Sequence, residues 1–405
     1  MKKVLLITRV SGFIPQHEMN NVRILQEMGY EVHYAANYNT VVYGKDNSRL
    51  DGTGIIRHQV DFDRLPIPKR VSTAYKQIKK IIEEGEYDLI HCHMPTSAAI
   101  ARSAAESVRK KTGRKVPVIY TAHGFHFFSG APLQNWLYYP VEKHYSRYTD
   151  RLILINEEDY NRACKFPLRG RAERINGVGV DLKKYEKYKK HDWGISGDIK
   201  PKDVEVDIHT KYNIKRDNAI LISVGELTKL KNHMVIIEAF KELKDLKISY
   251  LICGSGPKEM ELKKRVEELN LTDRVHFAGY VTNVPELLMQ SDCFVLPSRR
   301  EGLPVAMMEA MAVGLPVIAT KIRGITDLIE HTKGGYLVDD WEPENYAVKI
   351  RRMFTLKDGK SNVKRDIRRE EMGEWNRDRM KQFSLEVVEK QMREIYDGVT
   401  HGGVE

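Results

Sequence analysis

The chain has 405 residues, of which 41% are hydrophobic and 30% are charged, with 66 Lys and Arg against 56 Asp and Glu. This length suggests two domains, each large enough to bury its own core. No apolar run approaches the ~18 to 20 residues of a membrane span, and no secretory signal follows Met1, so we expect a cytoplasmic protein. Four dispersed cysteines without C-x-x-C spacing favour neither a disulfide framework nor a zinc site.

Short apolar runs alternate with helical patterns along the first half of the chain. The expected strands cover residues 4–7, 32–35, 89–93, 116–121 and 152–155. The expected helices lie near residues 16–28, 96–111, 133–148 and 157–165. Such alternation is typical of a parallel sheet with helices on both faces. We therefore predict a doubly wound α/β domain over residues 1–182.

A polar, lysine-rich stretch from residue 183 to 211 interrupts this pattern and has the composition of a linker or insertion. A second series of strands and helices then predicts another doubly wound domain over residues 212–375. Its expected strands cover residues 219–224, 248–253, 275–277, 293–296 and 317–319. A last helix, at about 384–400, could pack back on the first domain or on the second. Parallel sheets bind ligands beyond the carboxyl ends of their strands, so two facing domains would place the site in a cleft.

The loop after residues 293–296 has the strongest chemical pattern, because it opens a helix with Gly302, Leu303, Pro304 and Val305. Proline suits the first helical turn, where its missing N–H costs little. The free amides of Gly302, Leu303 and Val305, together with the helix dipole, form an anion site suited to phosphate.

Two carboxylates flank this anion site. Glu301 lies in front of the helix and Glu309 eight residues further on, so they are separated by up to about 12 Å. Carboxylates accept hydrogen bonds from hydroxyls, and a sugar nucleotide has hydroxyls at both ends of its diphosphate. The loop therefore predicts a sugar-nucleotide site.

The motifs Glu301–Pro304 with Glu309, followed by residues 312–320, resemble the signature of the family-4 retaining glycosyltransferases, which have the GT-B fold. Further agreement comes from residues 175–181, 224–227, 231–233, 254–257 and 278–281. The resemblance spans residues 3 to about 355 outside the linker, and implies two Rossmann-like domains facing a central cleft. Residues 121–128 and the Asn232-His233 pair look most like bacterial transferases of capsule and exopolysaccharide pathways.

The resemblance also implies roles for single residues. Glu301 would bind hydroxyls of the donor sugar, Glu309 the ribose of the nucleotide, and Lys231 the diphosphate. His123, at the end of an expected strand, would lie near the anomeric carbon and a hydroxyl of the donor sugar, so His123 and Glu301 are the expected catalytic residues. The expected donor-binding residues are Gly12, Lys229, Lys231, Gly254, Val281, Gly302, Leu303, Val305 and Glu309. No metal and no cofactor besides the nucleotide-sugar donor is expected.

Glu226 departs from the family pattern, because most relatives have an arginine beside the diphosphate. A carboxylate cannot neutralise phosphate. Either Lys229 or Lys231 must therefore contribute more, or Glu226 turns away to pair with one of them.

A pair of histidines, His91 and His93, lies two residues apart on an expected strand. This spacing places both imidazoles on one face of the strand. Since no third ligand is in view, a metal ion is not expected there.

The excess positive charge lies wholly in the first half, since residues 1–211 hold 35 basic and 25 acidic side chains and the remainder holds 31 of each. Basic side chains on two expected helices are Lys76, Lys79, Lys80, Arg102, Arg109, Lys110, Lys111, Arg114 and Lys115. Aromatic groups suited to a headgroup layer are Phe125, Phe127, Phe128, Trp136, Tyr138 and Tyr139. We therefore expect peripheral attachment to the anionic inner face of the cell membrane, the alternative being a generically basic, soluble face.

The prediction is thus a GT-B hexosyltransferase that moves an N-acetylated or related hexosyl group from UDP to a polyprenyl-diphosphate-linked sugar, for capsule or exopolysaccharide. The resemblance implies retention of anomeric configuration. One alternative is a UDP-sugar epimerase of the same fold, which would act without an acceptor. Another alternative is a basic nucleic-acid-binding protein. That function would give the loop with Glu301 and Glu309 no role, because carboxylates repel a phosphate backbone. No nucleic-acid partner is therefore expected.

Overall fold

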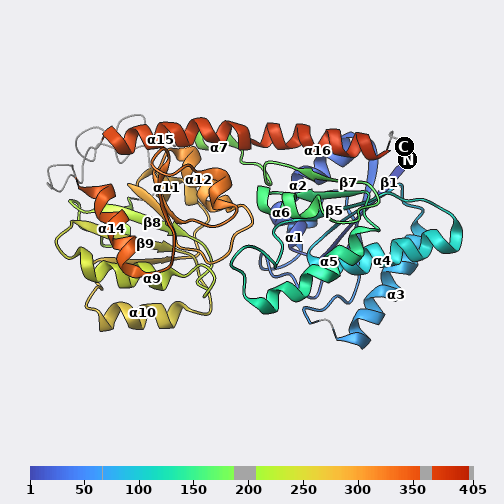
Figure 1. Ribbon diagram of the computed structural model, residues 1–405, viewed down its shortest axis with the longest axis horizontal. Coiled ribbons are helices and arrows are strands. Elements are labelled where there is room, and N and C mark those ends of the chain that lie inside the picture. The colour runs from blue at the N-terminus through green and yellow to red at the C-terminus, as the bar shows by residue number, and fades with distance from the viewer. Residues whose placement is uncertain (66, 187–206, 356–366, 401–405) are drawn as a thin grey trace. The chain divides into compact units, whose positions relative to one another are not determined.

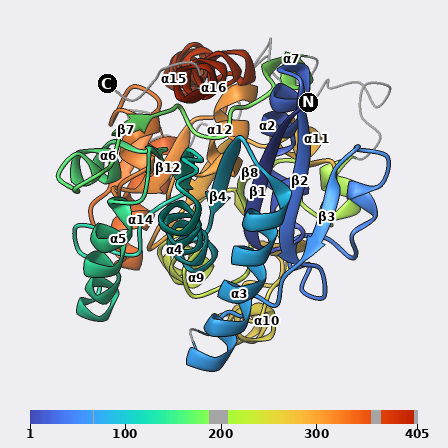
Figure 2. The ribbon, with the colours of Figure 1, turned by 90° about the vertical axis from the view of Figure 1, so that its right-hand side faces the viewer.

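The computed structural model describes residues 1–65, 67–186, 207–355 and 367–400. The chain divides into two compact units, Met1–Gly179 with Leu385–Glu405, and Val180–Ser384. Each unit is a parallel sheet with helices on both faces (Figure 1, Figure 2). The predicted pair of doubly wound α/β domains is therefore confirmed.

The first unit has a seven-stranded sheet in the order β3-β2-β1-β4-β5-β6-β7. Its strands are β1 (Lys2–Val10), β2 (Tyr30–Asn37), β3 (Ile56–Gln59), β4 (Leu89–His93), β5 (Val118–Ala122), β6 (Arg151–Leu154) and β7 (Arg171–Arg174). Its helices are α1 (Phe13–His17), α2 (Met19–Glu27), α3 (Pro68–Gly85), α4 (Pro95–Thr112), α5 (Tyr138–Ser146), α6 (Glu157–Ala163) and α16 (Leu385–Thr400). Helices α3, α4 and α5 lie on one face of the sheet, and α2 and α16 lie on the other (Figure 1).

The C-terminal helix α16 packs on the first unit because it has an apolar stripe at helical spacing. The buried side chains of this stripe are Val388, Met392, Ile395, Tyr396 and Val399. Each such burial contributes about 1.5 to 3 kcal/mol. Ion pairs between α2 and α16 join Arg23 to Glu389 and Arg393 to Glu27. Of the two packings left open by the sequence, α16 takes the one on the first unit.

Residues alternate between the two faces of β4, as expected for a strand. Ile90 and Cys92 belong to the core beneath α3 and α4. His91 points to the other face, where its Nδ1 lies 3.0 Å from the Tyr396 hydroxyl and its Nε2 lies 2.8 Å from Thr121 Oγ1. The histidines of β4 therefore lie on the α16 side of the sheet.

The second unit has a six-stranded sheet in the order β10-β9-β8-β11-β12-β13. Its strands are β8 (Ala219–Val224), β9 (Ile248–Cys253), β10 (Val275–Gly279), β11 (Cys293–Leu296), β12 (Val317–Thr320) and β13 (Gly335–Val338). Its helices are α7 (Leu182–Glu186), α8 (Ile208–Lys211), α9 (His233–Ala239), α10 (Glu259–Glu268), α11 (Val284–Met289), α12 (Val305–Val313), α13 (Ile325–Leu328), α14 (Pro343–Phe354) and α15 (Ile367–Met380). Helices α9, α10 and α14 lie on one face, and α11, α12 and α15 on the other (Figure 1).

Three strands were not expected from the sequence. Both β3 (Ile-Arg-His-Gln) and β7 (Arg-Ala-Glu-Arg) are edge strands whose side chains are mostly polar and largely exposed. Edge strands need no apolar pattern, because they have one neighbour and face water. The third, β13, is buried but short, and it begins at the second of two consecutive glycines.

The expected linker at 183–211 falls mainly on residues 187–206, which lie outside the described residues. Its two ends are helical, in α7 and α8, and both of these helices belong to the second unit. That unit begins at Val180 and continues through α15 to Ser384, past the expected end at residue 375.

Candidate functional site

Each sheet reverses its strand order at one point, between β1 and β4 in the first unit and between β8 and β11 in the second. Loops diverge there at the carboxyl ends of the strands, and this is where doubly wound folds bind ligands. The predicted residues His123, Lys231 and Glu301 all lie in loops beside these two points.

Lys231 and Glu301 pair with each other in the second unit. Lys231 Nζ, from the β8–α9 loop, lies 2.7 Å from Glu301 Oε1, from the β11–α12 loop. The two loops are also joined by the Arg299 amide, which donates to the Leu230 carbonyl over 2.8 Å. The side chain of Glu301 is 10% exposed and that of Lys231 is 27% exposed. Lys231 and Glu301 therefore form one accessible ion pair in the free protein, although they were expected to hold different parts of a donor.

The backbone N–H groups of the predicted anion site are available as hydrogen-bond donors. Gly302, Leu303 and Val305 donate to no acceptor among the residues that the structure describes. Pro304 is the N-cap of α12, one position before the first helical turn in which the sequence placed it. The arrangement can hold an anion at the helix N-terminus.

Glu309 is mostly buried on α12, and burial raises the pKa of its carboxyl above the ordinary value. The Tyr185 hydroxyl of α7 donates to Glu309 Oε1 over 2.6 Å. One carboxylate oxygen is thus oriented by a side chain that sequence reasoning missed. Tyr185 lies in the lysine-rich stretch that was interpreted as a solvated linker, where its aromatic ring among lysines was the only signal.

The remaining predicted residues of the second unit lie in three different loops. Gly254 has a φ of +145°, and a Cβ there would lie 1.9 Å from the Gly225 carbonyl oxygen, so close packing of two loops requires a glycine. Val281 is half-buried after β10, and Lys229 is exposed after β8. Their roles toward a donor stay predictions.

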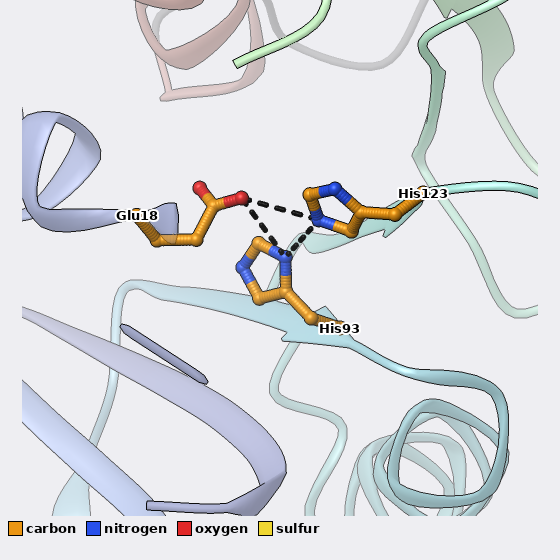
Figure 3. Close-up of side chains that lie close together, drawn as sticks. All are labelled: Glu18, His93 and His123. Atoms are coloured by element: carbon orange, nitrogen blue, oxygen red, sulfur yellow. Dashed lines mark hydrogen bonds and ion pairs between the residues drawn. The ribbon is translucent and has the colours of Figure 1, made fainter. Parts of the chain in front are cut away.

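In the first unit, Glu18, His93 and His123 meet beside the reversal between β1 and β4 (Figure 3). Glu18 Oε1 lies 3.1 Å from His123 Nε2 and 3.7 Å from His93 Nδ1. The two imidazole nitrogens lie 3.3 Å apart. The expectation that no third group accompanies the β4 histidines was therefore wrong, because the chain brings Glu18 and His123 to His93 from distant positions in the sequence.

Burial and neighbouring groups together set the pKa values in and around this cluster. On its own it raises the pKa of Glu18, but the attraction of His93 and the hydrogen bond from His123 outweigh it and lower that pKa to about 2. Burial also holds the pKa of His93 well below its ordinary value and lowers that of His17 to about 4. At neutral pH the cluster therefore combines a carboxylate with uncharged His93 and His17.

Gly12 begins the loop after β1, as the resemblance required. A Cβ at this position would lie 2.5 Å from the carbonyl oxygens of both Val41 and Tyr43. Close approach of the chain itself therefore explains this glycine, and its expected contact with a donor stays a prediction.

Comparisons with known proteins agree with both units. The family described as "Glycosyl transferase 4-like" matches residues 3–156, and "Glycosyl transferases group 1" matches residues 205–374. The Bacillus subtilis protein EpsD, named as a glycosyltransferase, is 34% identical over 357 residues, which cover 87% of each chain. This chain belongs to the glycosyltransferases.

Other relatives of this glycosyltransferase have more specific names. The Escherichia coli protein named UDP-Gal:alpha-D-GlcNAc-diphosphoundecaprenol alpha-1,3-galactosyltransferase is 30% identical over 280 residues, covering 67% of this chain and 66% of its own. Among solved structures, Anabaena HepE in complex with UDP and glucose has a TM-score of 0.74 at 16% identity, covering 98% of this chain and all of its own. The structural neighbours share the GT-B fold.

Glu226 does not pair with Lys229 or Lys231, so that one of the two alternatives is wrong, while a larger contribution of these lysines toward the diphosphate stays a prediction. Its side chain is exposed, and it forms no ion pair among the described residues. Lys231 pairs instead with Glu301. In this glycosyltransferase the carboxylate at position 226 is therefore left facing solvent.

Part of the expected membrane surface of the glycosyltransferase is buried. Phe125, Phe127 and Phe128 are 2%, 0% and 7% exposed, so they belong to the core and not to a headgroup layer. Arg102 is also buried, 2.8 Å from the Glu142 carboxylate. The expectation for the three phenylalanines failed because these aromatic side chains, which follow the end of a strand, pack beneath the sheet. None of the described helices is both long and apolar enough to cross a membrane.

Acidification is expected to destabilise the glycosyltransferase between about pH 6.5 and 4. Burial lowers the pKa of His91 in the first unit and of His233 in the second to about 4, against an ordinary value of 6.5. The unfolded chain therefore binds more protons in this window, which costs about 2 kcal/mol of stability per histidine at pH 5. Thermal unfolding at pH 7.5 and 5 measures the loss, and an equal midpoint at both would contradict it.

Proposed function

We propose that this glycosyltransferase transfers a hexosyl group from a UDP-sugar to a lipid-linked saccharide during assembly of an exopolysaccharide. The observation that carries the proposal is the Lys231 and Glu301 pair, placed where the second sheet reverses its order. The names of its relatives support the substrate classes, since one acts on a diphosphoundecaprenol-linked sugar and others belong to colanic acid and amylovoran biosynthesis. We expect an N-acetylated or related hexosyl group.

Binding of the donor would separate the ion pair. Lys231 would turn to the diphosphate, beside the free amides at the start of α12, and Glu301 would accept hydrogen bonds from sugar hydroxyls. Glu309, with one oxygen oriented by Tyr185, would accept from the ribose. Hydrogen bonds to charged groups contribute about 1.5 to 3 kcal/mol each, and more in the transition state as the leaving diphosphate gains charge.

The reaction we propose retains the anomeric configuration. The acceptor hydroxyl attacks the anomeric carbon on the face from which UDP leaves, and the departing diphosphate takes the hydroxyl proton. His123 would contact a hydroxyl of the same sugar. Because the acceptor oxygen attacks the anomeric carbon directly as the bond to UDP breaks, the step needs no carboxylate nucleophile, and because the phosphate takes the proton it needs no separate base. No metal is proposed.

A panel of nucleotide sugars tests the donor class by thermal stabilisation. A ligand at 100 times its Kd raises the free energy of unfolding by about 2.7 kcal/mol. UDP and one or more UDP-sugars should raise the unfolding midpoint, while GDP-linked sugars should not. Absence of a shift with every uridine nucleotide would contradict the UDP assignment.

We also propose that the first unit attaches to an anionic membrane surface. Four apolar side chains are exposed in the 3₁₀ helix Leu133–Leu137 and in α5, namely Leu133, Leu137, Tyr138 and Val141. Exposed basic residues, Lys143 and Arg147, follow on the same segment. Basic groups attract anionic lipid by about 1 kcal/mol each, and apolar groups next to them can enter the headgroup layer.

Flotation with liposomes tests this attachment. Wild-type protein should float with anionic vesicles and much less with neutral ones, and the double variant Leu133→Ser, Leu137→Ser should bind several-fold less. Both leucines are more than 70% exposed, at 88% and 73%, so their loss should leave the unfolding midpoint unchanged. Equal non-binding to both kinds of vesicle would rule out the membrane surface.

A further inference from the structure

Glu18 is a buried carboxylate that the proposed reaction does not use. It is 3% exposed and lies between α1 and α2. Its Oε2 accepts from the Asn21 side-chain amide over 2.5 Å, and its Oε1 faces His123 Nε2 and His93 Nδ1. A buried ion is tolerated only when such donors surround it. The contact with His123 Nε2 is within hydrogen-bond distance and therefore requires a proton on that nitrogen, whereas His93 Nδ1 lies beyond hydrogen-bond distance of Glu18.

A metal ion is the other occupant that these three groups could share, since their ligand atoms lie within 4.8 Å of one another. Metal-bound histidine, however, normally donates its second ring N–H to an acceptor. His93 Nε2 is buried and has no hydrogen-bond partner among the described residues. Binding of a metal at His93 Nδ1 would force an N–H into that position. Without a metal, His93 can keep its proton on Nδ1, which leaves Nε2 unprotonated and avoids a buried N–H without an acceptor.

We propose that Glu18 is a positioning residue that holds His123 in the Nε2–H tautomer and so presents Nδ1 as a hydrogen-bond acceptor to a hydroxyl of the donor sugar. This inference rests on the proposed role of His123. Figure 3 shows the second ring nitrogen of His123 turned away from Glu18 and His93. The His123 side chain is 24% exposed, against 4% for Glu18 and 1% for His93. Only His123 in this cluster is open enough to reach a substrate.

The surroundings of His123 leave Glu18 as its one ionised contact at neutral pH among the described residues. The Phe13 ring packs edge-on against His123 at 5.1 Å. The titratable groups around the cluster are His17 of α1, Arg49 after β2, His91 and His93 of β4, and Tyr396 of α16. A tautomer with the proton on Nδ1 instead of Nε2 would remove this acceptor.

The variant Glu18→Gln tests the proposal in the full chain. We expect kcat for transfer to fall about 10- to 100-fold, with the Kd for UDP unchanged because UDP lacks the sugar. The matched control is Glu31→Gln, because Glu31 pairs with His33 Nε2 over 2.8 Å on β2, away from the Glu18 cluster. This control variant should leave both kcat and the Kd for UDP unchanged.

Nitrogen-15 NMR of labelled histidine reads the tautomer without turnover, with the His123 signals identified by their loss in His123→Ala. Wild-type His123 should be protonated at Nε2, and the Glu18→Gln variant should show a changed tautomer. Protonation at Nδ1 in the wild type would overturn the proposal, even if the variant fails to fold. An unchanged tautomer in the variant would overturn it as well. Because this readout needs no donor, its failure is distinguishable from failure of the proposed transferase reaction.

Discussion

Replacing Glu301 with alanine is expected to lower kcat for glycosyl transfer about 100- to 1000-fold while the protein stays folded. Groups aimed at a reacting centre typically contribute on this scale, because their hydrogen bonds strengthen as charge develops. Glu301 is placed for this role by the β11–α12 loop and is held there by Lys231. The expected loss appears in the rate of transfer from a UDP-sugar.

Binding of UDP alone should separate the role of Glu301 from that of Lys231. The variant lacks the partner that occupies Lys231 Nζ in the free protein, so UDP should bind as tightly as to the wild type or more tightly. A matched control is Glu330→Ala, which breaks an exposed Glu–Lys pair with Lys333 in the same unit. Turnover of Glu301→Ala within about threefold of the control would contradict the assigned role.

Replacing His123 with alanine should lower kcat about 100-fold, and it should leave the Kd for UDP unchanged. The reason is that His123 belongs to the first unit and is proposed to contact the sugar, whereas the groups proposed for the nucleotide belong to the second. Single proton-transferring or hydrogen-bonding side chains typically account for 10²- to 10⁴-fold.

The exposed histidine His144, on α5, provides the matched control for this variant. Transfer by His144→Ala should equal that of the wild type, and both variants should unfold at the wild-type temperature. Near-normal turnover in His123→Ala together with Glu301→Ala would reject the site as a whole.

The second unit could be predicted closely from the sequence because its chemistry is local. Glu301, the glycine and proline after it, and the helix that carries Glu309 are contiguous, so one loop and one helix contain most of the pattern. The periodicity of buried strands such as β8 and β9 is equally local.

Groups assembled from distant positions could not be predicted in this way. Glu18 and His93 are 75 positions apart in the sequence and look like a helix-surface carboxylate and a buried strand histidine until β1 and β4 become neighbours. Tyr185 lies in a segment whose lysines indicate solvent, although its ring is 3% exposed. Phe127 illustrates the opposite error, since composition suggested a membrane contact and packing buries it completely.

The most direct test of the account is a transfer assay with purified protein, UDP-sugars and a polyprenyl-diphosphate-linked sugar, followed by mass spectrometry of the lipid product. We expect release of UDP and an acceptor heavier by one hexosyl residue, both abolished or nearly so in Glu301→Ala. Conversion of the UDP-sugar without an acceptor, or equal product from wild type and variant, would contradict it.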